Sequence, residues 1–263
     1  MIAADAMLRT LATALPDEAL PAGVPHLGAA EARLVGGVAA LEGETLLSGA
    51  ALLLKVELLA AALGSNAPAD VRGLATTLEA SLALSEADEL AAAAQSGSWE
   101  AVGRFAARIG LEADAVITLV DYATRPALRA GARAVRELVA KSRWHRGTCP
   151  ACGSPPLLAE LRGGGTSGTA EHERLLRCGR CLSAWSFPRL RCVSCGETNH
   201  RQLAYLHGAG EDNYRRAEVC STCRGYLKSI AVLAPLDHYQ LLSADFTTTA
   251  LDVAALERGF HRT

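Results

Sequence analysis

The sequence predicts an α+β protein, in which an N-terminal all-α helical domain is followed by two tandem four-cysteine β modules and a C-terminal helix. Three observations indicate this fold class. Alanine and leucine are abundant in the first half of the 263-residue chain, and aromatic residues make up only 5% of the whole, a composition that favours helix packing. All eight cysteines lie in four Cys-x-x-Cys pairs in the second half. Short runs of β-type residues lie between those pairs.

Residues 1–143 are predicted to form the helical domain. Apolar residues recur at three- and four-residue spacing between turn signals at residues 21–28, 64–70 and 96–100. The most apolar segment, residues 51–63, contains charged residues and is too short to span a bilayer, so we expect a buried helix there. The N-terminus lacks the pattern of a secretory signal. We therefore expect a cytoplasmic protein with reduced thiols and no membrane span.

The last helix of this domain is predicted to begin near Pro126, because proline suits the first turn of a helix. Arg125, Arg129, Arg133 and Arg136 follow one another at four-, four- and three-residue spacing and therefore share a face. Charge runs of this kind are usually solvated, and we expect a solvated helix face. The alternative is a stripe that contacts an acidic surface of a protein partner.

After residue 143 the helical period ends and β-type runs begin. The runs predicted as strands are residues 157–161, 174–178, 184–187, 201–208, 213–220 and 225–233. A Gly-rich insert at residues 162–173 is predicted to be a hairpin loop. A final helix is predicted after Asp237, through residues 247–259. The predicted boundaries are 144–187 for the first four-cysteine module, 188–235 for the second, and 236–263 for a C-terminal helical segment.

The cysteines form an internal repeat of two units. In each unit an opening pair followed by glycine is separated from a closing pair, by 25 residues in the first unit and 24 in the second. Four thiolates at this spacing favour a tetrahedral S4 site, so the sequence predicts two metal sites of the rubredoxin-like or zinc-ribbon-like type. The predicted ligands are Cys149, Cys152, Cys178 and Cys181 at the first site, and Cys192, Cys195, Cys220 and Cys223 at the second.

Two questions about these sites stay open at the level of sequence. Interleaved pairing, in which the two opening pairs share one metal, is an alternative to the sequential pairing that the repeat favours. The S4 ligand set is typical of both zinc and iron and does not choose between them. A thioredoxin-like redox dithiol is a poor fit, because such a site needs one reactive pair on a βαβ scaffold.

No catalytic residues are predicted, and we expect that the protein is not an enzyme. An S4 site has no open coordination position for a substrate. None of the seven histidines has a ligand spacing, and no P-loop, nucleophile elbow or dinucleotide-binding motif stands in a suitable context. Residues 1–143 have 12 basic and 17 acidic side chains and the rest of the chain has 14 and 11. The net charge of residues 144–263 is therefore +3, which is too small to predict a nucleic-acid-binding domain.

The cysteine pairs and their surroundings resemble the formate dehydrogenase accessory protein family, FdhE. The resemblance rests on residues 149–156, 176–196 and 217–230, through the order of the four pairs, Trp185 after the second pair, and the sequence GYLK after the last. It implies a non-catalytic cytoplasmic assembly factor that binds the catalytic subunit of formate dehydrogenase before that enzyme is exported. It also implies that the eight cysteines bind two metal ions, iron being favoured and zinc the alternative.

Two other classes of function compete with this reading. A zinc-ribbon nucleic-acid-binding protein is disfavoured by the small charge and by the lack of interleaved aromatic and basic residues. A rubredoxin-type electron carrier is disfavoured because that function gives the large helical half no role. Oligomeric state is not predicted by the sequence.

Overall fold

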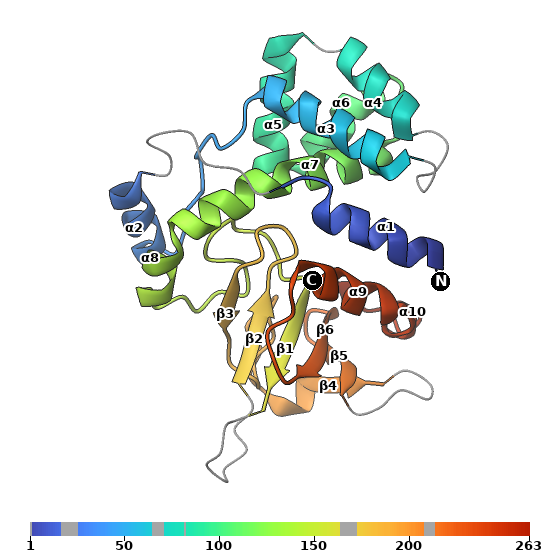
Figure 1. Cartoon of the computed structure of the whole chain (residues 1–263). Coiled ribbons are helices and arrows are strands. Elements are labelled where there is room, and N and C mark those ends of the chain that lie inside the picture. The colour runs from blue at the N-terminus through green and yellow to red at the C-terminus, as the bar shows by residue number, and fades with distance from the viewer. Residues whose placement is uncertain (1, 17–25, 65–70, 82, 164–172, 208–213) are drawn as a thin grey trace. The chain divides into compact units, whose positions relative to one another are not determined.

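The computed structural model describes residues 2–16, 26–64, 71–81, 83–163, 173–207 and 214–263. The chain divides into two compact units, Met1–Lys141 and Ser142–Thr263 (Figure 1). The Gly-rich insert that is predicted as a hairpin loop lies largely outside the described residues, as do the turn signals at residues 21–28 and 64–70. Within the described part of the chain, no helix is long and apolar enough to cross a membrane.

The described residues of the N-terminal unit form helices, as the sequence predicts. These helices are α1 (Ile2–Thr13), α2 (Leu27–Val35), α3 (Gly49–Leu63), α4 (Val71–Ala80), α5 (Leu84–Ser96), α6 (Trp99–Arg108), α7 (Ala113–Ala134) and α8 (Arg136–Lys141). Helix α3 packs against α4, α5 and α7. It is the buried helix expected at residues 51–63, and its buried residues Leu52, Val56, Leu59 and Leu63 recur at four-, three- and four-residue spacing.

Helix α7 does not begin near Pro126, so this prediction is wrong. The helix starts at Ala113 and continues through the proline. Proline inside a helix removes one backbone hydrogen bond. Here the residues on both sides are buried, among them Val120, Ala123 and Ala127, and the burial of their apolar surface offsets the lost bond.

The predicted solvated arginine face is wrong at two of its four positions. Arg133 and Arg136 are exposed, whereas Arg125 and Arg129 are only 9% and 7% exposed. Arg125 forms an ion pair with Asp121 (2.6 Å) and its guanidinium lies over the ring of Tyr122. Arg129 donates to the carbonyl oxygen of Leu15 (3.1 Å). Specific polar partners within the same unit therefore permit the burial of these two charges.

The C-terminal unit is built on a seven-stranded mixed sheet of order β3-β2-β1-β6-β5-β4, with β7 paired to β6. Its strands are β1 (Leu158–Arg162), β2 (Glu173–Arg177), β3 (Ala184–Ser186), β4 (Leu203–Leu206), β5 (Arg215–Cys220), β6 (Gly225–Val232) and β7 (His261–Arg262). The first six coincide with the six predicted β-type runs. Strands β1 and β6 are parallel, with Ala159 opposite Ser229.

This sheet joins the two repeat units that the sequence places in separate modules. Strands β1 to β3 come from the first repeat unit and β4 to β6 from the second, and the β1–β6 pairing makes the two sets continuous. The physical reason is the unpaired edge that each small sheet would otherwise have. Pairing the edges satisfies their backbone groups and leaves β1 and the first six residues of β6 almost entirely buried.

The C-terminal segment contains two helices, where the sequence predicts one. Helix α9 (His238–Thr247) begins with a capping box made by Asp237 and Gln240, and α10 (Thr249–Leu256) follows after Thr248. The hydroxyl of Thr248 donates to the carbonyl oxygen of Ala244 (2.7 Å). Threonine hydroxyls compete in this way with the helical ladder, which accounts for the break between the helices.

A buried polar network fastens α9 and α10 to strand β6. Lys228, which is 1% exposed, places its Nζ atom 2.6 Å from Asp245 Oδ1 and 2.7 Å from Asp252 Oδ2. The hydroxyl of Tyr226 donates to Asp252 Oδ1 (2.9 Å). Burial, together with the adjacent Asp252 carboxylate, raises the pKa of Tyr226 to about 12.

This network predicts a loss of stability at high pH that depends on Tyr226. An unfolded tyrosine loses its proton near pH 10, whereas the folded state holds it to about pH 12. The stabilisation from the raised pKa is therefore present below pH 10 and lost as the pH rises toward 12. Urea unfolding of the metal-loaded chain between pH 9 and 12 measures this loss. The Tyr226→Phe variant should show a smaller fall than the parent, and parallel curves for the two proteins would contradict the assignment.

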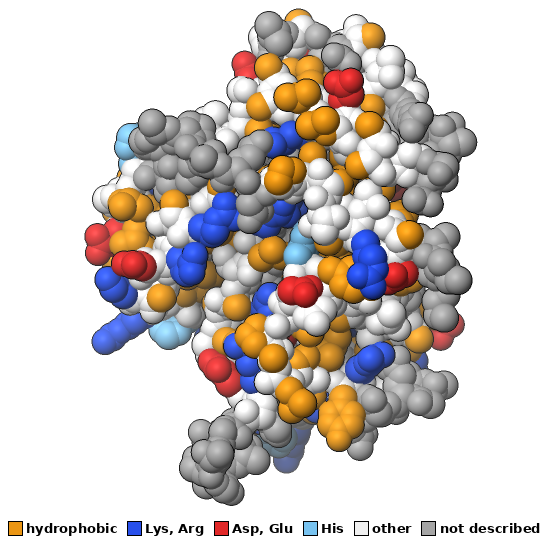
Figure 2. All heavy atoms as spheres, viewed as in Figure 1, with side chains coloured by type: hydrophobic (Ala, Val, Ile, Leu, Met, Phe, Trp, Pro, Cys, Tyr) orange, Lys and Arg blue, Asp and Glu red, His pale blue; other side chains and the backbone are white. Residues whose placement is uncertain are grey.

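Hydrophobic and charged side chains are interspersed on the molecular face drawn in Figure 2. Among the described residues of that face, Lys and Arg side chains lie among acidic, apolar and other side chains.

Candidate metal centres

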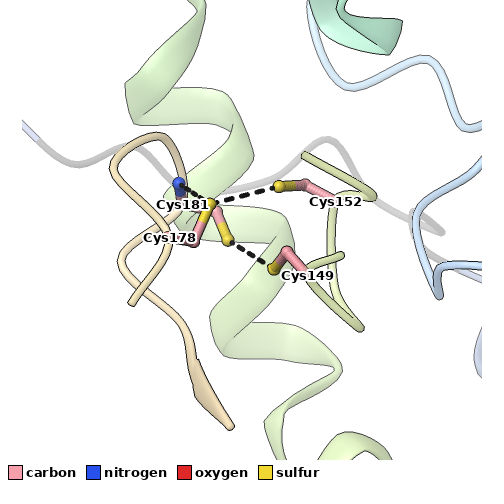
Figure 3. Close-up of side chains that lie close together, drawn as sticks. All are labelled: Cys149, Cys152, Cys178 and Cys181. Atoms are coloured by element: carbon pink, nitrogen blue, oxygen red, sulfur yellow. Dashed lines mark hydrogen bonds between the residues drawn. The ribbon is translucent and has the colours of Figure 1, made fainter. Parts of the chain in front are cut away.

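The first cysteine group lies at one end of the β1–β2 hairpin. Cys149 and Cys152 precede β1, while Cys178 and Cys181 directly follow β2. The four side chains point toward one another (Figure 3), with 3.5 Å between the Sγ atoms of Cys149 and Cys181 and 3.5 Å between those of Cys152 and Cys178. All four residues are buried.

The second group has the same arrangement at the β5–β6 turn. Cys220 ends β5 and Cys223 lies just before β6, facing the pair Cys192 and Cys195. The Sγ atoms of Cys192 and Cys223 are 3.6 Å apart, and those of Cys195 and Cys220 are 3.7 Å apart. Cys195 is exposed and Cys223 is half-buried. The sequential pairing favoured by the internal repeat is confirmed, and the interleaved alternative is wrong.

Both groups have the dimensions of a tetrathiolate metal site. The four Sγ atoms of each lie within 4.8 Å of one another. In a tetrahedral zinc site with metal–sulfur distances of about 2.3 Å, neighbouring sulfur atoms are about 3.8 Å apart. The four sulfur pairs given above, at 3.5 to 3.7 Å, are close to that value. An all-sulfur tetrahedral set suits zinc or iron, so each group could hold one such ion.

The turns that present the cysteines share one backbone conformation. The residue after each pair has a positive φ angle: Gly153 (77°), Leu182 (63°), Gly196 (77°) and Arg224 (62°). In the opening turns, the N–H of each glycine donates to the carbonyl of the first cysteine, at 2.9 Å and 3.1 Å. The sequence indicates this turn only where glycine occupies the position. At the closing pairs the same turn is imposed on Leu182 and Arg224, which adopt a left-handed conformation that is unfavourable for them.

Two serine hydroxyls contact sulfur atoms of the first group, a feature that the sequence analysis missed. The Sγ of Cys152 is 3.3 Å from the Ser154 hydroxyl, and the Sγ of Cys181 is 3.2 Å from that of Ser183. Arg180 in turn donates to Ser154 Oγ (3.2 Å). Each serine follows its cysteine by two positions, and that spacing is the signal that could have identified it. Such outer contacts orient metal ligands and tune their charge.

Burial and hydrogen bonds between neighbouring thiols shift the pKa values of several of these cysteines, and not all in the same direction. Burial raises the pKa of Cys149, whereas hydrogen bonds from Cys149 and Cys178 lower the pKa of Cys152. Burial also raises the pKa of Cys223 to about 12. A metal ion binds thiolates only, so loading either group releases protons and weakens as the pH falls.

Two aromatic residues lie near the cysteine groups in the sequence. Within the described residues, the clusters of three or more side chains able to hold a metal ion are the two cysteine groups, and neither includes a histidine. Trp185 and Tyr226, which lie close to the closing pairs in sequence, are buried. The indole N–H of Trp185 donates to the Arg146 carbonyl (3.2 Å), which ties β3 to the segment before the first cysteine.

The fold and the cysteine groups together define a class: an α+β protein with a helical unit and a sheet unit that contains two four-cysteine groups suited to metal. Comparison with known proteins narrows the class. Residues 190–263 match the family described as FdhE, C-terminal domain. The crystal structure of the FdhE protein from Pseudomonas aeruginosa matches 99% of this chain and 85% of its own, with a TM-score of 0.70 and 26% identity.

Curated relatives agree with this result. The FdhE homolog of Stutzerimonas stutzeri is 37% identical over 115 residues, which cover 43% of this chain and 35% of the relative. The homolog of Pseudomonas aeruginosa is 38% identical over 122 residues, which cover 44% and 38%. These alignments therefore span little more than a third of each relative. The chain is therefore similar to FdhE proteins in its C-terminal sequence and in its fold, as the resemblance of its cysteine motifs predicts.

Proposed function

We propose that the chain is a non-catalytic accessory protein in formate dehydrogenase maturation, which binds the catalytic subunit of that enzyme in the cytoplasm before export. The observation that supports this proposal is the pair of four-cysteine groups in a chain whose C-terminal part is similar to FdhE proteins. Each group supplies four sulfur ligands and so fills a tetrahedral coordination sphere. A saturated sphere suits a structural or redox-sensing role and offers no position for a substrate.

The eight cysteines are proposed as the ligands of two metal ions, one in each group. A bound ion supplies folding free energy to a sheet unit whose own core is small. Iron is favoured by the family resemblance and zinc satisfies the same ligands. An iron site would also change its charge by one on reduction without exchanging a ligand, which allows a redox-sensing role.

Capture of the partner tests the proposal. The metal-loaded full chain, immobilised through a tag, is mixed with a lysate that contains a formate dehydrogenase catalytic subunit, and the bound fraction is identified by mass spectrometry. We expect enrichment of that subunit over a matched column carrying the Cys149→Ser/Cys192→Ser variant. Failure to retain the subunit, combined with binding of DNA at physiological salt, would overturn the proposal in favour of a nucleic-acid-binding protein. The colour of the protein assigns the metal, because iron tetrathiolate sites are red and zinc sites are colourless.

A further inference from the structure

The two cysteine groups differ in their access to solvent. The first group is buried at all four positions, whereas the second contains the exposed Cys195 and the half-buried Cys223. The hydroxyls of Ser154 and Ser183 contact the sulfur atoms of the first group. In the second group, the positions equivalent to these serines are Glu197 and Gly225. The closed and the open group therefore have different surroundings.

A pocket of about 570 Å³ lies beside the second group and has Cys192 and Cys195 in its wall. A smaller pocket of about 90 Å³ includes Cys192 and Cys220. Neither wall includes a cysteine of the first group. The volume of the larger pocket is in the range that holds a small molecule. A ligand of that size can therefore reach the second group from solvent.

The wall of the larger pocket contains arginine and histidine side chains and, among the described residues, no Asp or Glu side chain. These residues are His145, Arg146, Arg191, His261 and Arg262. Arg262 forms an ion pair with Asp245. Of the three arginines in this wall, Arg146 and Arg191 form no ion pair among the described residues. The Arg191 guanidinium lies against the turn that presents Cys195, with its Nη2 atom 3.3 Å from where a side chain on Gly196 would begin.

Charge decides which ligand this pocket can admit. A zinc ion held by four thiolates has a net charge of about −2, and such a centre repels an incoming anion. Guanidinium groups at the pocket wall offset that repulsion, and they pair well with carboxylates. The combination of an open thiolate, a pocket and neighbouring arginines fits a ligand that carries both a thiol and a carboxylate.

We propose that the second centre is a ligand-exchange site, at which a small anionic thiol replaces Cys195, while the ligands of the buried first centre exchange much more slowly. In the exchange the incoming thiol loses its proton and forms a metal–sulfur bond. The bond between the metal and Cys195 Sγ breaks, and that sulfur accepts the proton. No electron is transferred. Arg146 and Arg191 act as positioning residues for the carboxylate of the ligand.

The test uses the full chain loaded with zinc, whose metal content is measured before any thiol is added. Mercaptosuccinate, an anionic thiol, is compared with the neutral 2-mercaptoethanol at equal thiol concentration and ionic strength, and a chromophoric indicator reports released zinc. One zinc ion per chain should leave at least about tenfold faster than the other, because access and thiolate character govern such reactions. Alkylation followed by mass spectrometry should label Cys195 first, and this readout requires no variant.

The Arg146→Gln/Arg191→Gln variant isolates the role of charge. It should slow the reaction with mercaptosuccinate several-fold and leave the rate with 2-mercaptoethanol unchanged. Two zinc ions released at one rate, first labelling among Cys149 to Cys181, or equal effects of the variant on both thiols would overturn the inference. It rests on the proposed metal-binding role of the cysteines. A chain without zinc before the thiol is added would show that the metal-binding role fails, whereas a loaded chain whose two ions leave at one rate would show that only the exchange fails. Neither result depends on capture of the formate dehydrogenase subunit.

Discussion

Serine in place of Cys149 is expected to leave the chain with one bound metal ion and to remove most of the cooperative stability of its C-terminal unit. Zinc binding at a structural tetrathiolate site contributes apparent free energies of about 10–16 kcal/mol, comparable with the whole stability of a domain, about 5–15 kcal/mol. The first group is buried, and it holds the ends of β1 and β2 together near the middle of the sheet. Thermal unfolding by circular dichroism and elemental analysis measure the two effects.

The matched variant is Cys192→Ser, which removes the equivalent ligand from the second group. It should also lower the metal content to one ion per chain. The loss of thermal stability should be smaller, because the second group contains the exposed Cys195 and the half-buried Cys223. The ion that remains should be held by residues 149–181. Loss of both ions from Cys192→Ser, in a chain that keeps its secondary structure, would count against two independent centres.

Replacing Glu160 by glutamine is expected to destabilise the C-terminal unit by about 3–5 kcal/mol, the cost of leaving a buried charge without its partner. Glu160 on β1 is fully buried. Its carboxylate forms ion pairs with Arg177 on β2 and with Arg162 (2.7 Å), and it accepts from the backbone N–H of Leu236 (3.0 Å), just before α9. One side chain therefore links two strands to the segment that leads into the C-terminal helices.

Urea unfolding of the metal-loaded chain measures this loss as a lower midpoint. The double variant Glu160→Leu/Arg177→Met is the control, because replacing a buried ion pair by apolar residues of similar volume is often neutral or stabilising. It should recover most of the stability that Glu160→Gln loses. A single variant within about 0.5 kcal/mol of the parent, the value typical of an exposed pair, would show that Glu160 is solvated in the folded protein.

The parts of this structure that are predictable from sequence depend on local spacing. Cys-x-x-Cys pairs that recur with matching separations indicate two four-cysteine groups, because the chain between two such pairs is long enough for a hairpin that brings them together. The six β-type runs and the buried period of α3 are equally local signals. Each rests on residues close in the chain, so that one sequence suffices to find it.

The features that the sequence does not predict depend on tertiary contacts. Parallel pairing of β1 with β6 joins residues about 70 positions apart, and no motif in either strand specifies its partner. The burial of Arg125 and Arg129 depends on partners that fold against them. Leu182 adopts a left-handed conformation because the turn that presents Cys178 and Cys181 requires it. In each case the surrounding structure decides the outcome, and the local sequence does not.

The central claim is that the second half of the chain is organised around two tetrathiolate metal centres. Elemental analysis of the purified full chain, combined with X-ray absorption at the edge of the metal found, tests it most directly. The account predicts two ions of zinc or iron per chain, each with four sulfur neighbours at about 2.3 Å. A folded chain that holds no metal and has its cysteines in disulfides, or a spectrum with nitrogen or oxygen ligands, would contradict it.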